Sequence, residues 1–130
     1  MRKQYHHRPV GPHRRLWDVH RLIRLSRDRP VVPVPLATIA EADEDWWYDG
    51  TASRPTPRAL ADHMALVERA DLRHPIILCA EGRLMDGMHR VVKAILAERS
   101  HIDARRFDVT PAPDHVNVAL DDLPYPDEAV

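Results

Sequence analysis

The chain has 130 residues, of which 44% are hydrophobic, and a formal net charge of −1 at pH 7. This length predicts one domain, and the small net charge argues against a globally basic nucleic-acid-binding protein. The single cysteine, Cys79, excludes an internal disulfide. No long apolar run and no signal peptide is visible in the sequence, so we expect a cytoplasmic protein with no membrane partner.

The two ends of the chain carry opposite charge. Residues 1–15 hold five Lys or Arg, three His and no acid, whereas residues 121–130 are acidic. We therefore predict a basic flexible arm over 1–15, a single folded domain over 16–120 and an acidic tail over 121–130. The arm offers a surface for nucleic acid or an acidic partner; a solvated arm with no partner is the alternative.

The first predicted elements are a helix and an extended strand. Asp18 can cap a helix over roughly Val19–Arg27, which Pro30 would end. Val31–Leu36 is extended, and its two prolines favour an edge strand.

An acidic, aromatic segment follows at residues 37–54. Its aromatic centre is Trp46-Trp47-Tyr48. The surrounding acids are Glu41, Asp43, Glu44, Asp45 and Asp49. Exposed aromatics can stack on a base, and the carboxylates can hold Mg²⁺ or act as a general base. The alternative is a solvated acidic loop that a tryptophan anchors.

Thr56-Pro57 is typical of a helix start. The expected core stripe of this helix is Leu60, Ala61, Met64 and Val67. His63 lies beside the stripe, and we predict a packed or surface histidine. Asp71–His74 should close the helix.

The second half of the chain alternates predicted strands and a helix. The strands are Pro75–Ala80, Arg83–Met85, His101–Val109 and His115–Leu120, and Glu81-Gly82 is a turn between the first two. A helix begins at Met88, with its core-facing stripe at Met88, Val91, Val92, Ile95 and Leu96.

The junction Asp86–Arg90 is the strongest candidate site. Asp86 is a good N-cap, and Gly87 lets a ligand approach the backbone. The first-turn N–H groups and a bidentate Arg90 suit an anion, most plausibly phosphate, to which His89 can donate a hydrogen bond or a proton. A charged Asp86 would repel that anion unless it turns away or holds a cation or proton. The alternative is an ordinary capped helix with a surface Arg90 and a packed His89.

Taken with its flanks, this stretch resembles the ParB/sulfiredoxin superfamily. The matching order is strand "VPVPLATI", helix, strands and helix start "PIILCAEGRLMDGMHR", then strand "IDARRF". The resemblance implies an α+β fold, a small mixed β-sheet with packed helices. It also implies nucleotide phosphate binding at the Gly87–Arg90 element, with Gly87, Met88, His89 and Arg90 as the binding residues. In related kinases the catalytic carboxylate follows the first strand, which makes Glu41 the matching choice here.

Two departures limit the resemblance. Sulfiredoxins have a catalytic cysteine where this chain has Met88, and a thioether cannot supply a thiolate nucleophile. Chromosome-partitioning proteins continue into a helix-turn-helix domain, for which we expect no room after Val109. Neither full activity is therefore expected.

We predict a protein that binds a nucleotide or another phosphorylated small molecule. ATP, ADP or CTP with Mg²⁺ is the expected ligand, and no dedicated metal ligands are predicted. If the chain is an enzyme, it is a nucleotide-dependent phosphotransferase or nucleotide hydrolase with Asp86, His89 and Glu41 as catalytic residues. The alternatives are a non-catalytic DNA-associated or nucleotide-sensing adaptor and a metal-dependent nuclease. The phosphoryl acceptor and the oligomeric state stay open.

Overall fold

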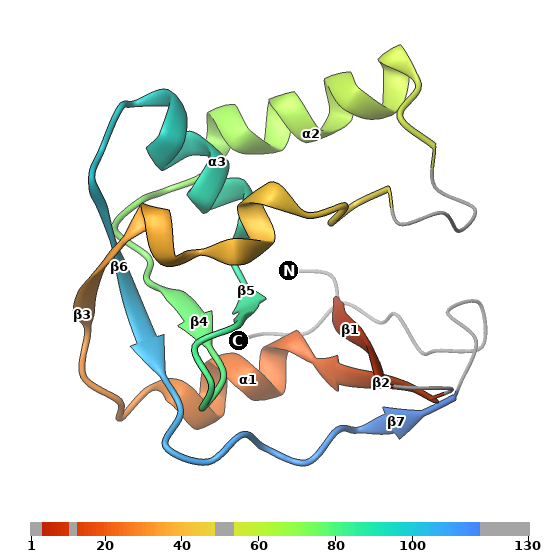
Figure 1. Ribbon diagram of the computed structural model, residues 1–130, viewed down its shortest axis with the longest axis vertical. Helices are drawn as coiled ribbons and strands as arrows, with labels where there is room; N and C mark the ends of the chain where they lie inside the picture. Colours follow the sequence, from red (N-terminus) through yellow and green to blue (C-terminus); the bar gives the residue numbers. More distant parts are fainter. Residues whose placement is uncertain (1–3, 11–12, 49–53, 118–130) are drawn as a thin grey trace.

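The computed structural model describes residues 4–10, 13–48 and 54–117 (Figure 1). The strands are β1 (Tyr5–Val10), β2 (His13–Asp18), β3 (Val32–Pro35), β4 (Ile76–Leu78), β5 (Leu84–Asp86), β6 (His101–Arg106) and β7 (His115–Val116). The helices are α1 (Val19–Ser26), α2 (Pro57–Arg69) and α3 (Met88–Leu96), with short 3₁₀ turns η1 (Leu36–Thr38) and η2 (Ala40–Asp43).

A four-stranded sheet with the order β3-β6-β4-β5 forms the centre of the fold. β4 is parallel to β6, and the other two pairings are antiparallel. With helices packed against this mixed sheet, the expected α+β class is confirmed. β3 lies at one edge of the sheet, as its prolines predict, because an edge strand can lose ladder donors on its outer side.

Both faces of the sheet are covered, which explains the unbroken apolar run in β4. Ile76 and Leu78 belong to one buried cluster with residues of α3, whereas Ile77 and Cys79 belong to a second cluster with Trp17 and Leu22. Successive side chains of a strand point to opposite faces, so a strand buried on both faces needs no polar alternation. In Figure 1, α2 and α3 lie at the top of the view, and α1 lies with β1, β2 and β7 at the bottom.

The predicted flexible arm is wrong for the residues that the structure describes. β1 and β2 pair antiparallel from Tyr5↔Asp18 to Val10↔His13, and β7 joins β2 to complete a second sheet of order β1-β2-β7. Two buried side chains hold this segment on the core, since Leu16 is fully buried and Trp17 is 3% exposed. The basic composition of the segment does not indicate them. Residues 1–3, 11–12 and the predicted tail 121–130 lie outside the described residues.

The expected apolar stripe of α2 is only partly buried. Val67 is 8% exposed, but Leu60 is 48% and Met64 is 62% exposed. The stripe prediction fails because α2 packs outside α3 rather than on the sheet (Figure 1). α3 begins at Met88, as predicted, and Met88 and Val91 of its expected core-facing stripe are buried. The stripe prediction is wrong for Ile95 and Leu96, which are exposed in the last turn. Within the described residues, no helix has the length and apolar character needed to cross a membrane.

Candidate functional site

The start of α3 lies directly after β5, at Gly87. This glycine has φ +112°, a conformation that L side chains rarely adopt, and a Cβ there would meet Cγ2 of Ile76 at 2.6 Å. Gly87, rather than Asp86, is the N-cap residue of α3, and it provides no side-chain cap. The predicted cap is therefore wrong: Asp86 is the last residue of β5, and its carboxylate turns to Arg90 instead of the helix N–H groups.

The other two α-helices begin with the side-chain caps that their sequences predict. Asp18 Oδ1 accepts from the backbone N–H of His20 at 2.9 Å, and Thr56 Oγ1 accepts from that of Ala59 at 3.1 Å. Among the α-helices of the described residues, α3 is thus the one whose first turn has no side-chain acceptor. Its free N–H groups and the positive end of its dipole are left for another acceptor.

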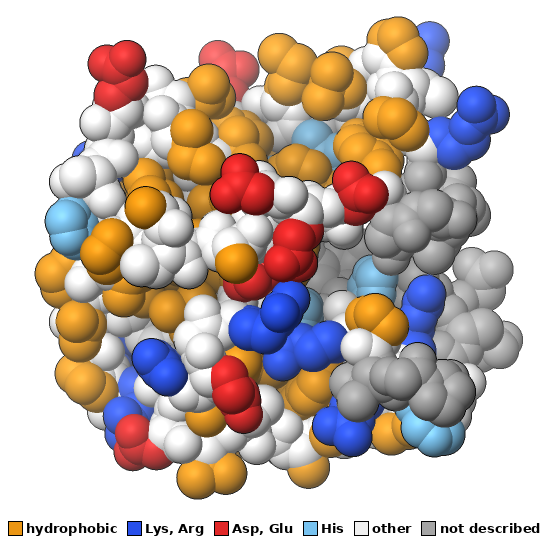
Figure 2. Space-filling view, in the orientation of Figure 1, with side chains coloured by type: hydrophobic (Ala, Val, Ile, Leu, Met, Phe, Trp, Pro, Cys, Tyr) orange, Lys and Arg blue, Asp and Glu red, His pale blue; other side chains and the backbone are white. Residues whose placement is uncertain are grey.

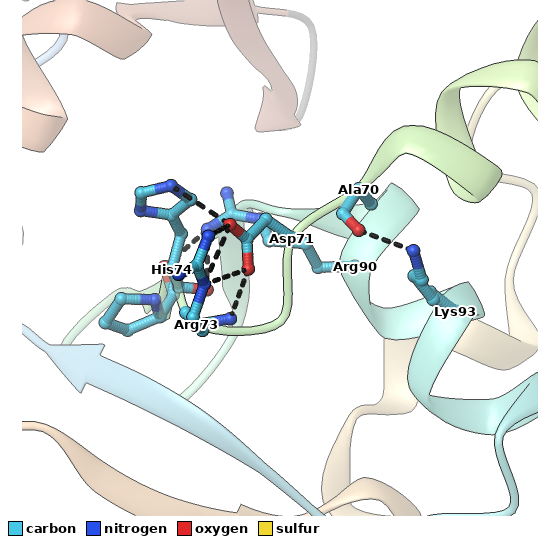
Figure 3. Close-up of polar contacts among 7 residues, drawn as sticks. Ala70, Asp71, Arg73, His74, Arg90 and Lys93 are labelled. Carbon is cyan, nitrogen blue, oxygen red and sulfur yellow. Dashed lines mark hydrogen bonds and ion pairs between the residues drawn. The ribbon is translucent and has the colours of Figure 1, made fainter.

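Arg90 fastens the start of α3 to the turn that precedes β4. Its Nη2 donates to Asp86 Oδ2 at 2.8 Å, and its Nη1 donates to the carbonyl oxygens of His74 and Pro75 at 3.0 and 2.6 Å. Figure 3 shows Arg90 and Lys93 reaching from α3 towards this turn, where Lys93 Nζ donates to the Ala70 carbonyl. The Arg90 guanidinium, which the sequence predicted to bind phosphate, therefore already donates to acceptors within the protein. The Asp86 carboxylate balances its charge.

A cleft of about 1440 Å³ opens in front of the Gly87–Arg90 element. Its described lining holds six arginines and four carboxylates, together with five histidines. The arginines are Arg8, Arg27, Arg69, Arg83, Arg90 and Arg105. The carboxylates are Glu44, Asp45, Asp71 and Asp86. Basic residues therefore outnumber acidic ones around this helix start, which favours an anionic ligand.

Several of these charges are paired across the cleft wall. Arg83 Nη2 lies 3.7 Å from Glu41 Oε2 and 3.3 Å from Glu44 Oε1. Figure 2 shows acidic and basic side chains adjoining near the middle of the face in view. Arg27 and Arg69, by contrast, are exposed and make no side-chain hydrogen bond or ion pair with the described part of the chain. In the described lining of the cleft, they are the arginines whose side chains are available to a ligand.

Two histidines and a tryptophan form one stacked group in the cleft wall. His63 Nδ1 of α2 and His89 Nε2 of α3 lie 2.9 Å apart. The Trp47 ring stacks on both imidazoles, with centroid distances of 4.1 Å to His63 and 4.7 Å to His89. His89 lies in the first turn of α3, as the sequence predicted. His63 is packed against Trp47 and His89, as predicted, and it also lines the cleft.

The surroundings of this pair keep both rings neutral at pH 7. Burial, together with the smaller effects of the nearby His63 and Arg90, lowers the pKa of His89 to about 4. Burial also lowers the pKa of His63, against the opposing effect of Asp62. A neutral imidazole has one donor and one acceptor nitrogen, which suits hydrogen bonding and proton transfer.

Glu41 is placed away from this group. Its side chain is 3% exposed, and Oε1 accepts from the backbone N–H of Leu84 at 2.6 Å. It is not part of the described cleft lining. The carboxylate predicted as catalytic therefore holds η2 against β5.

We expect Glu41→Ala to lower the free energy of unfolding by about 2 kcal/mol, because it leaves the buried Leu84 N–H without an acceptor. Asp43→Ala is the matched control in the same turn, since Asp43 is exposed and should change stability by less than about 0.5 kcal/mol. Urea unfolding of both variants measures the difference. If both variants lose the same free energy of unfolding, the Glu41–Leu84 hydrogen bond does not stabilise the fold.

The other predicted acids of this segment are dispersed. Asp43 is exposed, Glu44 pairs with Arg83, and Asp49 lies outside the described residues. Asp45 lines the cleft and makes no hydrogen bond or ion pair with the described residues. In the described ranges, no group of three or more His, Cys, Asp or Glu side chains is arranged to hold a metal ion.

Comparisons with known proteins add no assignment. No protein-family model, no curated protein and no solved structure matches this chain. The candidate site therefore depends on the geometry of its own residues.

Sequence reasoning missed the part of the site that comes from α1 and α2. On α2, Arg69 lies away from the predicted apolar stripe, whereas His63 lies beside it. Arg27 follows the last residue of α1, a helix that is basic along one face. A signal for His63 was present, since it lies just off the predicted stripe. Nothing in one sequence indicates that its partner is His89, 26 residues later.

Proposed function

We propose that this protein binds a phosphorylated small molecule of the nucleotide class in the cleft, with a phosphate at the first turn of α3. The observation that carries this proposal is the uncapped start of α3, which opens on a cleft richer in basic than in acidic residues. Free N–H groups at a helix start bind phosphate through hydrogen bonds and the helix dipole. The resemblance to the ParB/sulfiredoxin superfamily agrees with this and stays a prediction.

A charged Asp86 would repel an anion at the start of α3 if its charge were not balanced. Its carboxylate lies 2.8 Å from the Arg90 guanidinium, so the two charges balance each other beside the helix start. The N–H groups from Gly87 to His89 are then the phosphate donors. Arg27 and Arg69 provide the remaining positive charge, because Arg90 is engaged.

The tryptophans provide a surface for a base. Trp46 and Trp47 both line the cleft and are partly exposed, so a planar aromatic ligand can contact them. Their rings are also held in place, because Trp46 stacks on His6 and Trp47 on the His63–His89 pair. Aromatic rings that are already held in place lower the entropy cost of binding.

A Mg²⁺ ion that accompanies a nucleotide needs only one or two protein carboxylates in addition to phosphate oxygens. Asp45 fits this need, since it is the carboxylate of the described lining without a partner. Asp71 and Asp86 are paired with Arg73 and Arg90. Bound Mg²⁺ would neutralise phosphate charge, and phosphoryl transfer or nucleotide hydrolysis stays a prediction for such a complex.

Isothermal titration of ATP, ADP, CTP and AMP, with and without Mg²⁺, tests the proposal. We expect saturable binding of at least one nucleotide and a two- to fivefold weaker affinity, on the order of the value of an exposed charge contact, in Arg69→Ala and in Arg27→Ala. Arg99→Ala is the control, because Arg99 is exposed and lies outside the cleft lining. No binding of any nucleotide, or equal losses in all three variants, would contradict the proposal.

A further inference from the structure

The His63–His89 pair holds its two rings in one hydrogen-bonded unit. The rings come from different helices, and the nitrogens that face each other are 2.9 Å apart, a normal N–H···N distance. Both side chains are half-buried and line the cleft beside the first turn of α3. The pair therefore faces the place where the proposed phosphate binds.

The hydrogen bond limits how many protons the pair can hold. In the neutral pair one ring donates to the other, which uses one N–H and one lone pair. One added proton gives an imidazolium that donates to a neutral imidazole, and this charge-assisted bond is stronger than the neutral one. A second proton would put two N–H groups against each other and break the bond. The pair can therefore hold one extra proton but not two.

The groups around the pair determine when that proton is taken up. Asp62 of α2 favours the charged form of His63, whereas Arg90 of α3 disfavours that of His89. Arg90 is itself paired with Asp86 of β5, and the Trp47 ring face can stabilise a cation. From the neighbouring segment, the Tyr48 ring lies perpendicular to that of His63, and the acids Glu44 and Asp45 line the same cleft. Without a ligand the rings are neutral at pH 7. A bound dianion would provide negative charge that stabilises the protonated form of the pair.

We infer that the His63–His89 pair takes up one shared proton when an anion binds at the start of α3, so that ligand affinity in this cleft is coupled to pH. This inference rests on the proposed function, because it assigns a proton to that same anion site. It makes the pair a positioning and charge-matching unit that adds one positive charge only when the ligand is present.

Calorimetric titration of sulfate is the direct test, because sulfate keeps the same charge between pH 5 and pH 8. Titrations at pH 6 in two buffers with different protonation enthalpies measure the protons taken up per sulfate. We expect about one proton, and an affinity that falls by up to about tenfold for each unit of pH increase between pH 5 and 7. Sulfate binding with no proton uptake would overturn this inference and leave the proposed function intact. Failure of sulfate, pyrophosphate and all nucleotides to bind would overturn both.

Two variants assign the proton to the pair. His63→Gln and His89→Gln should each reduce the uptake to well below one proton and weaken sulfate binding at pH 6 by about tenfold, because either change removes the shared hydrogen bond. At pH 8 each variant should bind within about twofold of the parent. His101→Gln is the control, since His101 is exposed on β6 outside the cleft lining. Full proton uptake in His63→Gln would show that His63 has no part in holding the proton. Even if a variant does not fold, the proton uptake of the wild-type protein still tests the inference.

Discussion

Gly87→Ala is expected to lower the free energy of unfolding by about 4 kcal/mol, through backbone strain and overpacking together. The backbone of Gly87 has φ +112°, which is unfavourable for any residue with a Cβ. The added Cβ would also lie 2.6 Å from Cγ2 of Ile76, a β-branched residue that is fully buried in the sheet. Neither the strand nor the helix can move away without breaking the core around α3. Urea unfolding measures the loss.

Gly82→Ala separates the cost of backbone strain from the cost of overpacking. Gly82 also has a positive φ, +83°, but the atoms nearest to a Cβ there belong to the flexible Arg106 side chain, at 3.6 Å and beyond. Strain alone should then cost about 1–2 kcal/mol. If the two variants are equally destabilised, the contact with Ile76 is not what requires glycine at position 87.

Arg90→Ala is expected to lower the free energy of unfolding by about 3 kcal/mol, because the variant loses three hydrogen bonds of a charged donor and leaves Asp86 with no partner. Both side chains are largely buried, at 17% and 18% exposure. The guanidinium also joins two backbone carbonyls of the turn before β4 to the start of α3. Arg90→Lys should restore only part of the stability, since a lysine cannot make this fork.

Arg73→Ala is the matched control for this prediction. Arg73 pairs with Asp71 at 2.7 Å in the same turn, but its side chain is 89% exposed. An exposed ion pair is worth at most about 1 kcal/mol. Similar losses in the two variants, measured by urea unfolding, would show that Arg90 is a surface residue and not a structural connection. The same result would restore the sequence-based role of Arg90 as a free phosphate ligand.

Local signals in the sequence predicted the parts of the fold that depend on neighbouring residues. The caps Asp18 and Thr56, the start of α3 at Met88 and the turn at Gly82 are confirmed, because each depends on residues within one turn of chain. The apolar run of β4 also predicted a buried strand. These features are fixed by backbone preferences and by the alternation of side chains.

Contacts between distant segments could not be predicted in the same way. Asp86 has the residue type of a cap, but the left-handed backbone of Gly87 and the nearby Arg90 direct its carboxylate elsewhere. The basic composition at the N-terminus concealed a hairpin that Leu16 and Trp17 anchor. His63 meets His89 only after α2 has packed on α3. Periodicity shows which face of a helix is apolar but not which element will cover it.

The amide spectrum of the uniformly ¹⁵N-labelled protein, titrated with pyrophosphate and then with ADP, tests the central claim most directly. The three α-helix starts of the described chain serve as internal controls, because α1 and α2 are capped by side chains and α3 is not. We expect saturable shifts that are largest for the amides of Met88 and His89, with the amides of His20 and Ala59 unchanged. Equal shifts at all three helix starts, or no saturable shift at Met88 and His89, would contradict an anion site at the start of α3.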